Sequence, residues 1–162
     1  YSSTSSMMAN KRLAITIVFI IILIIGFLIY SRINPKEANE KYERPSSLDV
    51  VEQYFSSWSN KNYPNMYATI SDGFKKIEPT AKNLATFEEY TKSQKIDSIN
   101  MLSIKEKSND GNTAIVDYSI EFVLSSGGIN KFDGSFSLKY KQGDVIPGWK
   151  LIHPYGDNID LS

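Results

Sequence analysis

The feature that most constrains this chain is an apolar stretch without any charged residue, which runs from Leu13 to Tyr30. A helix rises about 1.5 Å per residue, so a run of this length nearly crosses a hydrocarbon core of about 30 Å. The stretch is longer than the apolar core of a typical signal peptide, and no small-residue cleavage site follows it. We therefore predict an uncleaved signal-anchor helix at residues 13–30, with a cleaved signal peptide as the alternative.

The orientation of this predicted membrane helix does not follow from lysine and arginine positions alone. Two basic residues precede it, and four more follow between Arg32 and Arg44. The short tail, residues 1–12, and a domain without cysteine favour a cytoplasmic N-terminus and an extracytoplasmic domain. We expect a single-pass protein of the cell membrane that contacts the lipid bilayer through residues 13–30.

Composition excludes several functional classes. The chain carries 18 basic and 18 acidic side chains, and the part after the apolar stretch is slightly acidic, which is a poor footprint for nucleic acid. There is no cysteine, so disulfides, thiolate chemistry and cysteine-ligated metals are excluded. We accordingly expect no cofactor and no nucleic-acid partner.

The remainder divides into a charged linker, residues 31–45, and one domain, residues 46–162. A helix is predicted at the start of this domain, because Ser46 or Ser47 can cap it and large apolar residues recur at helical spacing behind the cap. These apolar residues are Leu48, Val51, Tyr54, Phe55 and Trp58. They form one face, so we expect this helix to pack on a core.

Two shorter helices are predicted next. Pro64 suits the first turn of the second helix, and residues 71–73 are expected to end it. Residues 86–89, Thr-Phe-Glu-Glu, have the sequence of a capping box, which predicts that the third helix starts there and runs to about Gln94.

From Ile96 onward the period changes from helical to two, which predicts strands. The expected strands are separated by turns at residues 109–112, 125–128 and 142–144, and the last strand covers residues 148–153. The apolar rows of the middle strands are Ala114, Val116, Tyr118, Ile120, Phe122 and Leu124, then Phe132, Gly134, Phe136, Leu138 and Tyr140. The sequence therefore predicts an α+β fold, with three helices packed on a four-stranded antiparallel sheet.

Four segments carry a resemblance to a known family. They are residues 50–58 (VVEQYFSSW), 62–67 (NYPNMY), 86–90 (TFEEY) and 148–151 (GWKL). Together they resemble the nuclear transport factor two-like superfamily of cone-shaped α+β domains. More narrowly, they resemble the N-terminal spacer domain of low-affinity class B penicillin-binding proteins, which implies a non-catalytic extracytoplasmic docking element. The Ser-x-x-Lys nucleophile motif is absent, so penicillin binding is not implied.

Ionisable residues give weak signals for catalysis. His153 is the only histidine, so we expect a surface or rim residue rather than a metal ligand or catalyst. Asp117, Glu121 and Asp133 lie on the polar faces of neighbouring predicted strands. They could form a carboxylate pair for acid–base chemistry, but exposed acids that face lysines of the next strand are the simpler interpretation.

Aromatic residues are the better functional signal. The chain has 10 Tyr, 8 Phe and 2 Trp, and several are predicted to face the concave side of the sheet. The candidates for lining a cavity are Trp58, Tyr67, Tyr118, Phe122, Phe136 and Trp149. A cone with this lining can hold a small apolar ligand, although such rings more often simply fill a core.

Two hypotheses for function follow. The leading one is a non-enzymatic membrane protein whose domain docks on other membrane or envelope proteins in a secretion, conjugation or wall-building assembly, because an anchor raises the local concentration of its domain. Whether the protein forms a homo-oligomer stays open. The alternative is a small apolar-ligand binding module that uses the aromatic-lined cavity. An enzymatic role would require an acid or histidine inside that cavity.

Overall fold

The computed structural model describes residues 24–25 and 43–154, and residues 44–154 belong to one folded unit. The predicted membrane helix at residues 13–30 lies outside the described residues apart from Ile24 and Ile25, and so do the tail and most of the predicted linker. Among the residues that are described, no helix is both long and apolar enough to cross a membrane. Membrane attachment therefore stays a prediction.

Five helical elements precede the sheet in residues 43–154, where three helices were predicted. They are α2 (Ser47–Ser59), α3 (Tyr63–Tyr67), α4 (Asp72–Ile77), the short 3-10 helix η1 (Pro79–Ala81) and α5 (Leu84–Ser93). Of the two predicted caps, Ser46 is the one observed, and it forms a capping box with Asp49. The N-terminus of α2 thus has its free backbone donors satisfied by its own sequence.

Two predicted helix boundaries were wrong, both because a capping side chain was assigned the wrong place. Ser71 does not end a helix but begins α4, since its hydroxyl accepts a hydrogen bond from the backbone N–H of Phe74 at 2.9 Å. Likewise, α5 is capped by Asn83, whose side-chain oxygen accepts from the N–H of Thr86 at 2.8 Å. Thr86 is therefore inside the first turn of α5 and not its cap.

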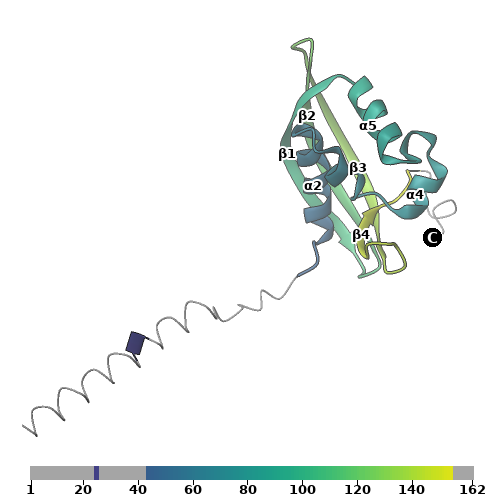
Figure 1. The fold of residues 1–162 in the computed structure, drawn as a ribbon. Helices are drawn as coiled ribbons and strands as arrows, with labels where there is room; N and C mark the ends of the chain where they lie inside the picture. Colours follow the sequence, from purple (N-terminus) through teal and green to yellow (C-terminus); the bar gives the residue numbers. More distant parts are fainter. Residues whose placement is uncertain (1–23, 26–42, 155–162) are drawn as a thin grey trace, which may run out of the picture. The chain divides into compact units, whose positions relative to one another are not determined.

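The four predicted strands and their antiparallel order are confirmed (Figure 1). They are β1 (Ile96–Asn109), β2 (Thr113–Leu124), β3 (Ile129–Lys141) and β4 (Gly148–Leu151), each paired with the next. The first two hairpins turn at Gly111 and Gly127, both at φ +91°, a conformation that favours glycine. Three register shifts in the pairing of β1 with β2 account for the mixed pattern of the β1 sequence.

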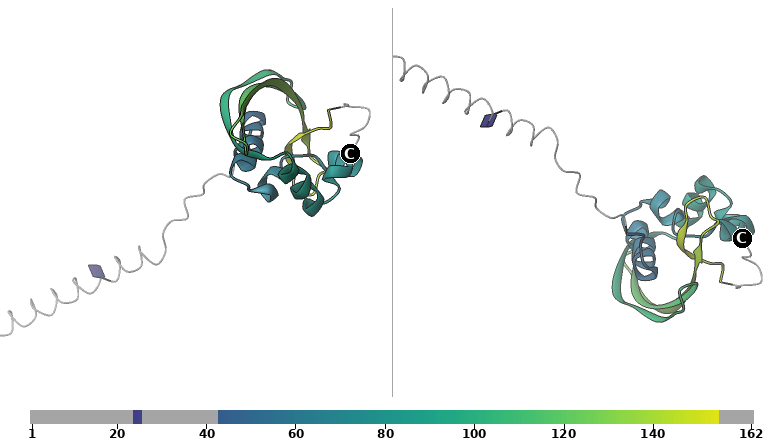
Figure 2. Two further views of the ribbon diagram at one scale, coloured as in Figure 1. Left: turned by 90° about the horizontal axis from the view of Figure 1, so that it is seen from above. Right: turned by 90° about the horizontal axis from the view of Figure 1, so that it is seen from below.

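The core lies where the curved sheet wraps around α2 (Figure 2). Helix α2 packs against β1, β2 and β4, and its residue Val51 has no exposed surface. Val116, Ile120 and Leu138, from the inner face of β2 and β3, are equally inaccessible. Burying these apolar side chains supplies the main driving force for this packing.

Strand β4 covers only one end of β3. Its pairing runs from Leu138 to Lys141, and a last hydrogen bond joins the N–H of Ile152 to the carbonyl of Ser137 at 3.1 Å. From Phe136 back to Ile129, no described strand pairs with that edge of β3. The inner face of the sheet is therefore closed at one end and left open at the other.

Candidate functional site

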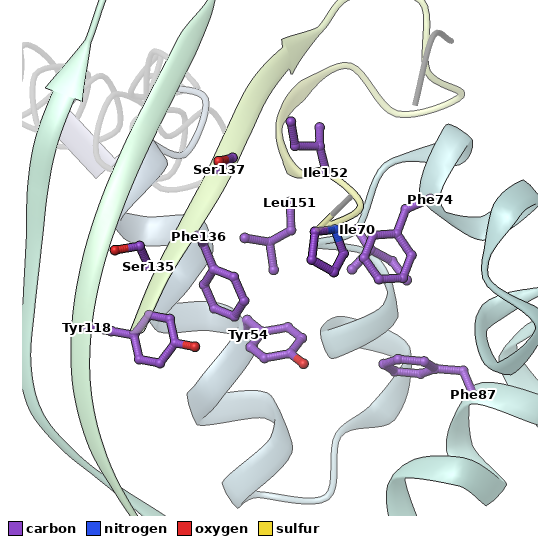
Figure 3. A pocket seen from close by; sticks show the side chains of 11 residues that line it. Tyr54, Ile70, Phe74, Phe87, Tyr118, Ser135, Phe136, Ser137, Leu151 and Ile152 are labelled. Atoms are coloured by element: carbon purple, nitrogen blue, oxygen red, sulfur yellow. The ribbon is translucent and has the colours of Figure 1, made fainter. Parts of the chain in front are cut away.

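A cavity of about 400 Å³, partly open to solvent, lies at the open end of the sheet. Figure 3 shows its wall, to which both the helices and the sheet contribute. From the helical side come Tyr54 of α2, Phe74 of α4, Phe87 of α5 and Ile70. The wall on this side is thus almost entirely apolar.

The segment that follows β4 closes the cavity beside Ile70. Leu151 is joined to this helical region by two backbone hydrogen bonds: its N–H donates to Thr69 at 2.8 Å, and its carbonyl accepts from Ser71 at 2.9 Å. Leu151, Ile152 and Pro154 then line the cavity. These bonds hold the end of β4 against the segment between α3 and α4, so they help to define the cavity.

On the sheet side, the rings of Tyr118 and Phe136, tilted by 33° to each other, form the wall. The ring centroids of Tyr118 and Phe136 are 4.7 Å apart, and Phe136 meets the ring of Tyr54 edge-on at 5.3 Å. Phe55, which is buried, supports Tyr118 from the core at 4.9 Å. Such contacts favour particular ring orientations, so the rings of this wall hold one another in place.

Gly134 makes room for the ring of Tyr118. The two residues are direct partners in the pairing of β2 with β3. A Cβ atom at position 134 would lie only 2.5 Å from the Tyr118 hydroxyl oxygen and 2.7 Å from its Cζ. The phenol therefore lies across the bare backbone of Gly134, and no other residue type fits there without moving it.

Among the described residues, Tyr54 and Tyr118 each bring a side-chain hydroxyl to this wall. Neither Tyr54 nor Tyr118 forms a hydrogen bond with any described residue through its hydroxyl. Burial raises the pKa of Tyr54, and the nearby phenols of Tyr118 and Tyr90 raise that pKa further. Burial also raises the pKa of Tyr118. Both hydroxyls are therefore neutral hydrogen-bond donors at physiological pH.

The two serines of the wall contribute main chain rather than hydroxyls. The Ser135 hydroxyl donates to the Asp117 carboxylate, which lies on the polar face of the sheet. Ser137 shares the orientation of Ser135 because side chains alternate along a strand. The described residues that line the cavity include no carboxylate, imidazole, amine or guanidinium group.

Of the six predicted lining residues, the structure places Tyr118 and Phe136 in the wall and the other four elsewhere. Trp58 and Phe122 pack on each other at 5.3 Å, and Tyr67 donates its hydroxyl to the Ala81 carbonyl at 2.8 Å. Trp149 packs edge-on against Tyr140 at 5.7 Å. The rings of these four residues are engaged in contacts of their own, so they shape the surrounding fold and do not border the cavity.

Sequence reasoning missed the helical half of the wall. Tyr54 belongs to the predicted apolar helix face, but helical periodicity does not distinguish a ring that borders a cavity from one that fills a core. Phe87 lies inside the predicted capping box, and that motif says nothing about a cavity. Ile152 and Pro154 carried no signal, because their place depends on where the chain leaves the sheet.

The surface or rim position expected for His153 was wrong, since the residue is 5% exposed and its ring packs on Phe74 at 5.0 Å. Its Nε2 lies 3.2 Å from the Glu78 carboxylate. Hydrogen bonds from the Thr80 side chain and, next, from His153 lower the pKa of Glu78. This pair lies behind the cavity wall and not in it.

The strand carboxylates do not form a site. In the pairing of β2 with β3, Glu121 lies opposite Lys131, while Asp117 lies opposite Ser135 and Asp133 opposite Ser119. Within the described part of the chain, no group of three or more acidic or histidine side chains could hold a metal ion. The arrangement matches acids on a solvated sheet face.

No protein-family model matches the chain, and no curated protein is significantly similar to it in sequence. Its fold is similar to that of a SEC-C motif containing protein from Psychrobacter arcticus, with a TM-score of 0.50 at 10% identity. That match covers 74% of this chain and 65% of the other, so the chain spans less than two thirds of that protein's length. At this identity the similarity shows the fold alone.

Two further similarities are weaker. A SEC-C motif containing protein from Rhodopseudomonas palustris gives a TM-score of 0.48 at 10% identity, over 67% of this chain and 79% of the other. A ketosteroid isomerase-like protein from Erwinia carotovora gives a TM-score of 0.41 at 14% identity, and the match covers 63% of this chain and 85% of the other. Proteins of the latter kind have the nuclear transport factor two-like fold. None of these three is a penicillin-binding protein, and the two weaker similarities carry no argument about function.

Proposed function

We propose that this domain is a binding module for a small apolar ligand, which occupies the cavity between Tyr54, Tyr118 and Leu151. The observation that supports it most is the cavity itself: about 400 Å³, bordered by aromatic and aliphatic side chains. Ligand sites in proteins are typically concave, largely apolar and provided with a few polar groups that orient the ligand. The two free tyrosine hydroxyls match that description.

We further propose that the cavity binds its ligand without converting it. General acid–base chemistry requires a side chain that exchanges protons near neutral pH. The described lining offers two phenols, and the raised pKa of each keeps it protonated. Docking on envelope proteins stays a prediction, because the anchor that motivated it lies outside the described residues apart from Ile24 and Ile25.

The test is a titration of the full chain with bicyclic hydrocarbons such as indane, followed by NMR of labelled isoleucine methyl groups. Ile70 and Ile152 line the cavity, whereas Ile129 is 61% exposed and serves as an internal control. The proposal predicts saturable shifts of the Ile70 and Ile152 methyl resonances with Ile129 unchanged. Absence of such shifts for the whole series, or equal shifts at Ile129, would overturn it.

A matched pair of variants makes the test specific. Ile152→Phe adds bulk inside the cavity and should weaken indane binding by about tenfold or more, because overfilled apolar space cannot accept a second group. Ile146→Phe makes the same change at a side chain that is 65% exposed, and should leave binding as it is. Thermal unfolding of both variants confirms that each is folded.

A further inference from the structure

We propose that the ligand is an uncharged molecule that carries a hydrogen-bond acceptor such as a ketone oxygen. This acceptor takes a hydrogen bond from the hydroxyl of Tyr118, and the hydroxyl of Tyr54 is the second donor. This inference rests on the proposed function and deepens it by naming the ligand class. Three observations on the described residues support it: the position of the Tyr118 phenol, the absence of a hydrogen-bond partner for either hydroxyl among these residues, and their uncharged lining of the cavity.

The Tyr118 hydroxyl lies over the neighbouring strand β3. Its oxygen lies over the backbone of Gly134, where a Cβ would approach it to 2.5 Å. Gly134 is not at positive φ, so the glycine is required for space and not for backbone conformation. The phenol is thereby carried across β3 toward the cavity (Figure 3).

Neither hydroxyl is satisfied within the described protein. No side-chain polar atom that is fully buried in the described residues lacks a hydrogen-bond partner. The hydroxyls of Tyr54 and Tyr118 have no such partner, so each must keep accessible surface, and both residues border the cavity. A ligand that excludes water without offering an acceptor would leave these donors unpaired, which is unfavourable.

The surroundings select against a charged ligand. Tyr54 is enclosed by the rings of Phe55, Trp58 and Phe136, at 5.2, 6.0 and 5.3 Å. No cationic side chain is among the described residues that line the cavity, so an anion would lose its hydration without gaining a partner. The same burial that raises the pKa of Tyr118 would disfavour a carboxylate or phosphate beside it.

The experiment compares two molecules of nearly equal shape, indane and 1-indanone, which differ by a ketone oxygen. Dissociation constants are measured from the Ile70 and Ile152 methyl shifts of the full chain, in the native protein and in Tyr118→Phe. The measured quantity is the preference for the ketone, expressed as the ratio of the two constants. A typical neutral hydrogen bond supplies about 1 kcal/mol, so Tyr118→Phe should lower this ratio about fivefold.

Two more variants locate the effect. Gly134→Ala keeps the hydroxyl but displaces it, and should lower the ketone preference as Tyr118→Phe does. Tyr140→Phe removes a hydroxyl that accepts a hydrogen bond from Arg44 and does not border the cavity. It should leave the ratio unchanged.

The outcomes separate this inference from the proposed function. If indane and 1-indanone bind but the ratio is the same in the native protein and in Tyr118→Phe, the acceptor inference is wrong and the apolar binding site stands. If neither molecule shifts the two methyl groups, both are wrong. A ratio that falls equally in Tyr140→Phe would also overturn the inference, because the effect would then not arise in the cavity.

Discussion

The two ends of the inner sheet face have the same alternating sequence pattern but different surroundings. At the closed end, Ala114, Val116 and Leu138 have no exposed surface. At the open end Ile120 is still buried, but Tyr118 and Phe136 border a cavity, and Phe132, which is paired with Ile120, is 51% exposed. Alternation determines which face a side chain occupies, but the covering elements determine whether that face becomes core or cavity.

The two ends differ in the elements that pack on the inner face of the sheet. Strand β4 pairs with β3 at the closed end alone, whereas helix α2 runs past both ends: its Ser47 donates to Glu106, and its Trp58 packs on Phe122. Toward the open end the chain leaves the sheet after Leu151, which is bound to Thr69 and Ser71 between α3 and α4. The space that remains between sheet and helices is the cavity. The molecule therefore combines a dry apolar core with an adjacent, partly open pocket on one continuous sheet.

The largest effect should come from truncating the closed end. Leu138→Ala removes a side chain with no exposed surface and should lower the free energy of unfolding by about 3 kcal/mol, through lost burial and a new void. Phe132→Ala, at the open end, should lower it by about 0.5 kcal/mol despite removing more atoms. Urea unfolding of both variants measures the contrast. Equal losses would show that the two ends are equally well packed.

A smaller effect is expected where the phenol of Tyr118 crosses β3. Gly134→Ala should destabilise the domain by about 1–2 kcal/mol, because the added Cβ meets the Tyr118 ring and must displace it. Gly128→Ala is the matched control, since its Cβ would have ordinary contacts, the nearest at 3.5 Å. Urea unfolding curves of both variants measure the difference in their free energies of unfolding. A Gly134→Ala variant as stable as Gly128→Ala would mean that Tyr118 is not held in this position.

The smallest effect concerns the polar contacts behind the open end. Thr80 and His153 lower the pKa of Glu78 in the folded state, so its carboxylate stabilises the fold at pH values above the ordinary glutamate pKa of about 4.3. That contribution is lost as the pH falls through the lowered pKa. Glu78→Gln should therefore destabilise the domain at neutral pH by less than about 1 kcal/mol, because solvent screens the partly exposed carboxylate.

The pH dependence provides the check on this prediction. The stability difference between the native protein and Glu78→Gln should shrink as the pH falls below the ordinary glutamate pKa, and it should be gone once the pH is below the lowered pKa of the folded state. Thermal unfolding across an acidic pH series measures it. A difference that stays constant over the series would show that the carboxylate charge is not what stabilises this region.

The fold was largely predictable because its signals are local. The alternation in β2 and β3, the Asp110–Gly111 turn and the Ser46 cap each depend on a few neighbouring residues, and all were confirmed. The α4 and α5 boundaries were missed because serine, threonine and asparagine all cap helices, and sequence alone did not rank Asn83 above Thr86.

The site was less predictable because it depends on contacts between distant segments. Tyr118 and Phe136 were recognised from the sheet pattern, whereas Phe74, Phe87 and Pro154 enter the wall through the path of the chain around α4, α5 and the end of β4. His153 was misjudged for the same reason, since its burial depends on Phe74 and Glu78. Membrane attachment rests on residues outside those described, so it stays a prediction.

The most direct test of the account is crystallography of the protein under xenon pressure, because xenon enters accessible apolar cavities and leaves polar ones empty. We predict a xenon atom in the cavity, in contact with Leu151 and Phe87 and within reach of the Tyr54 ring. A cavity without xenon and filled instead by ordered water or by side chains would contradict the central claim that this domain holds a ready-made apolar binding site.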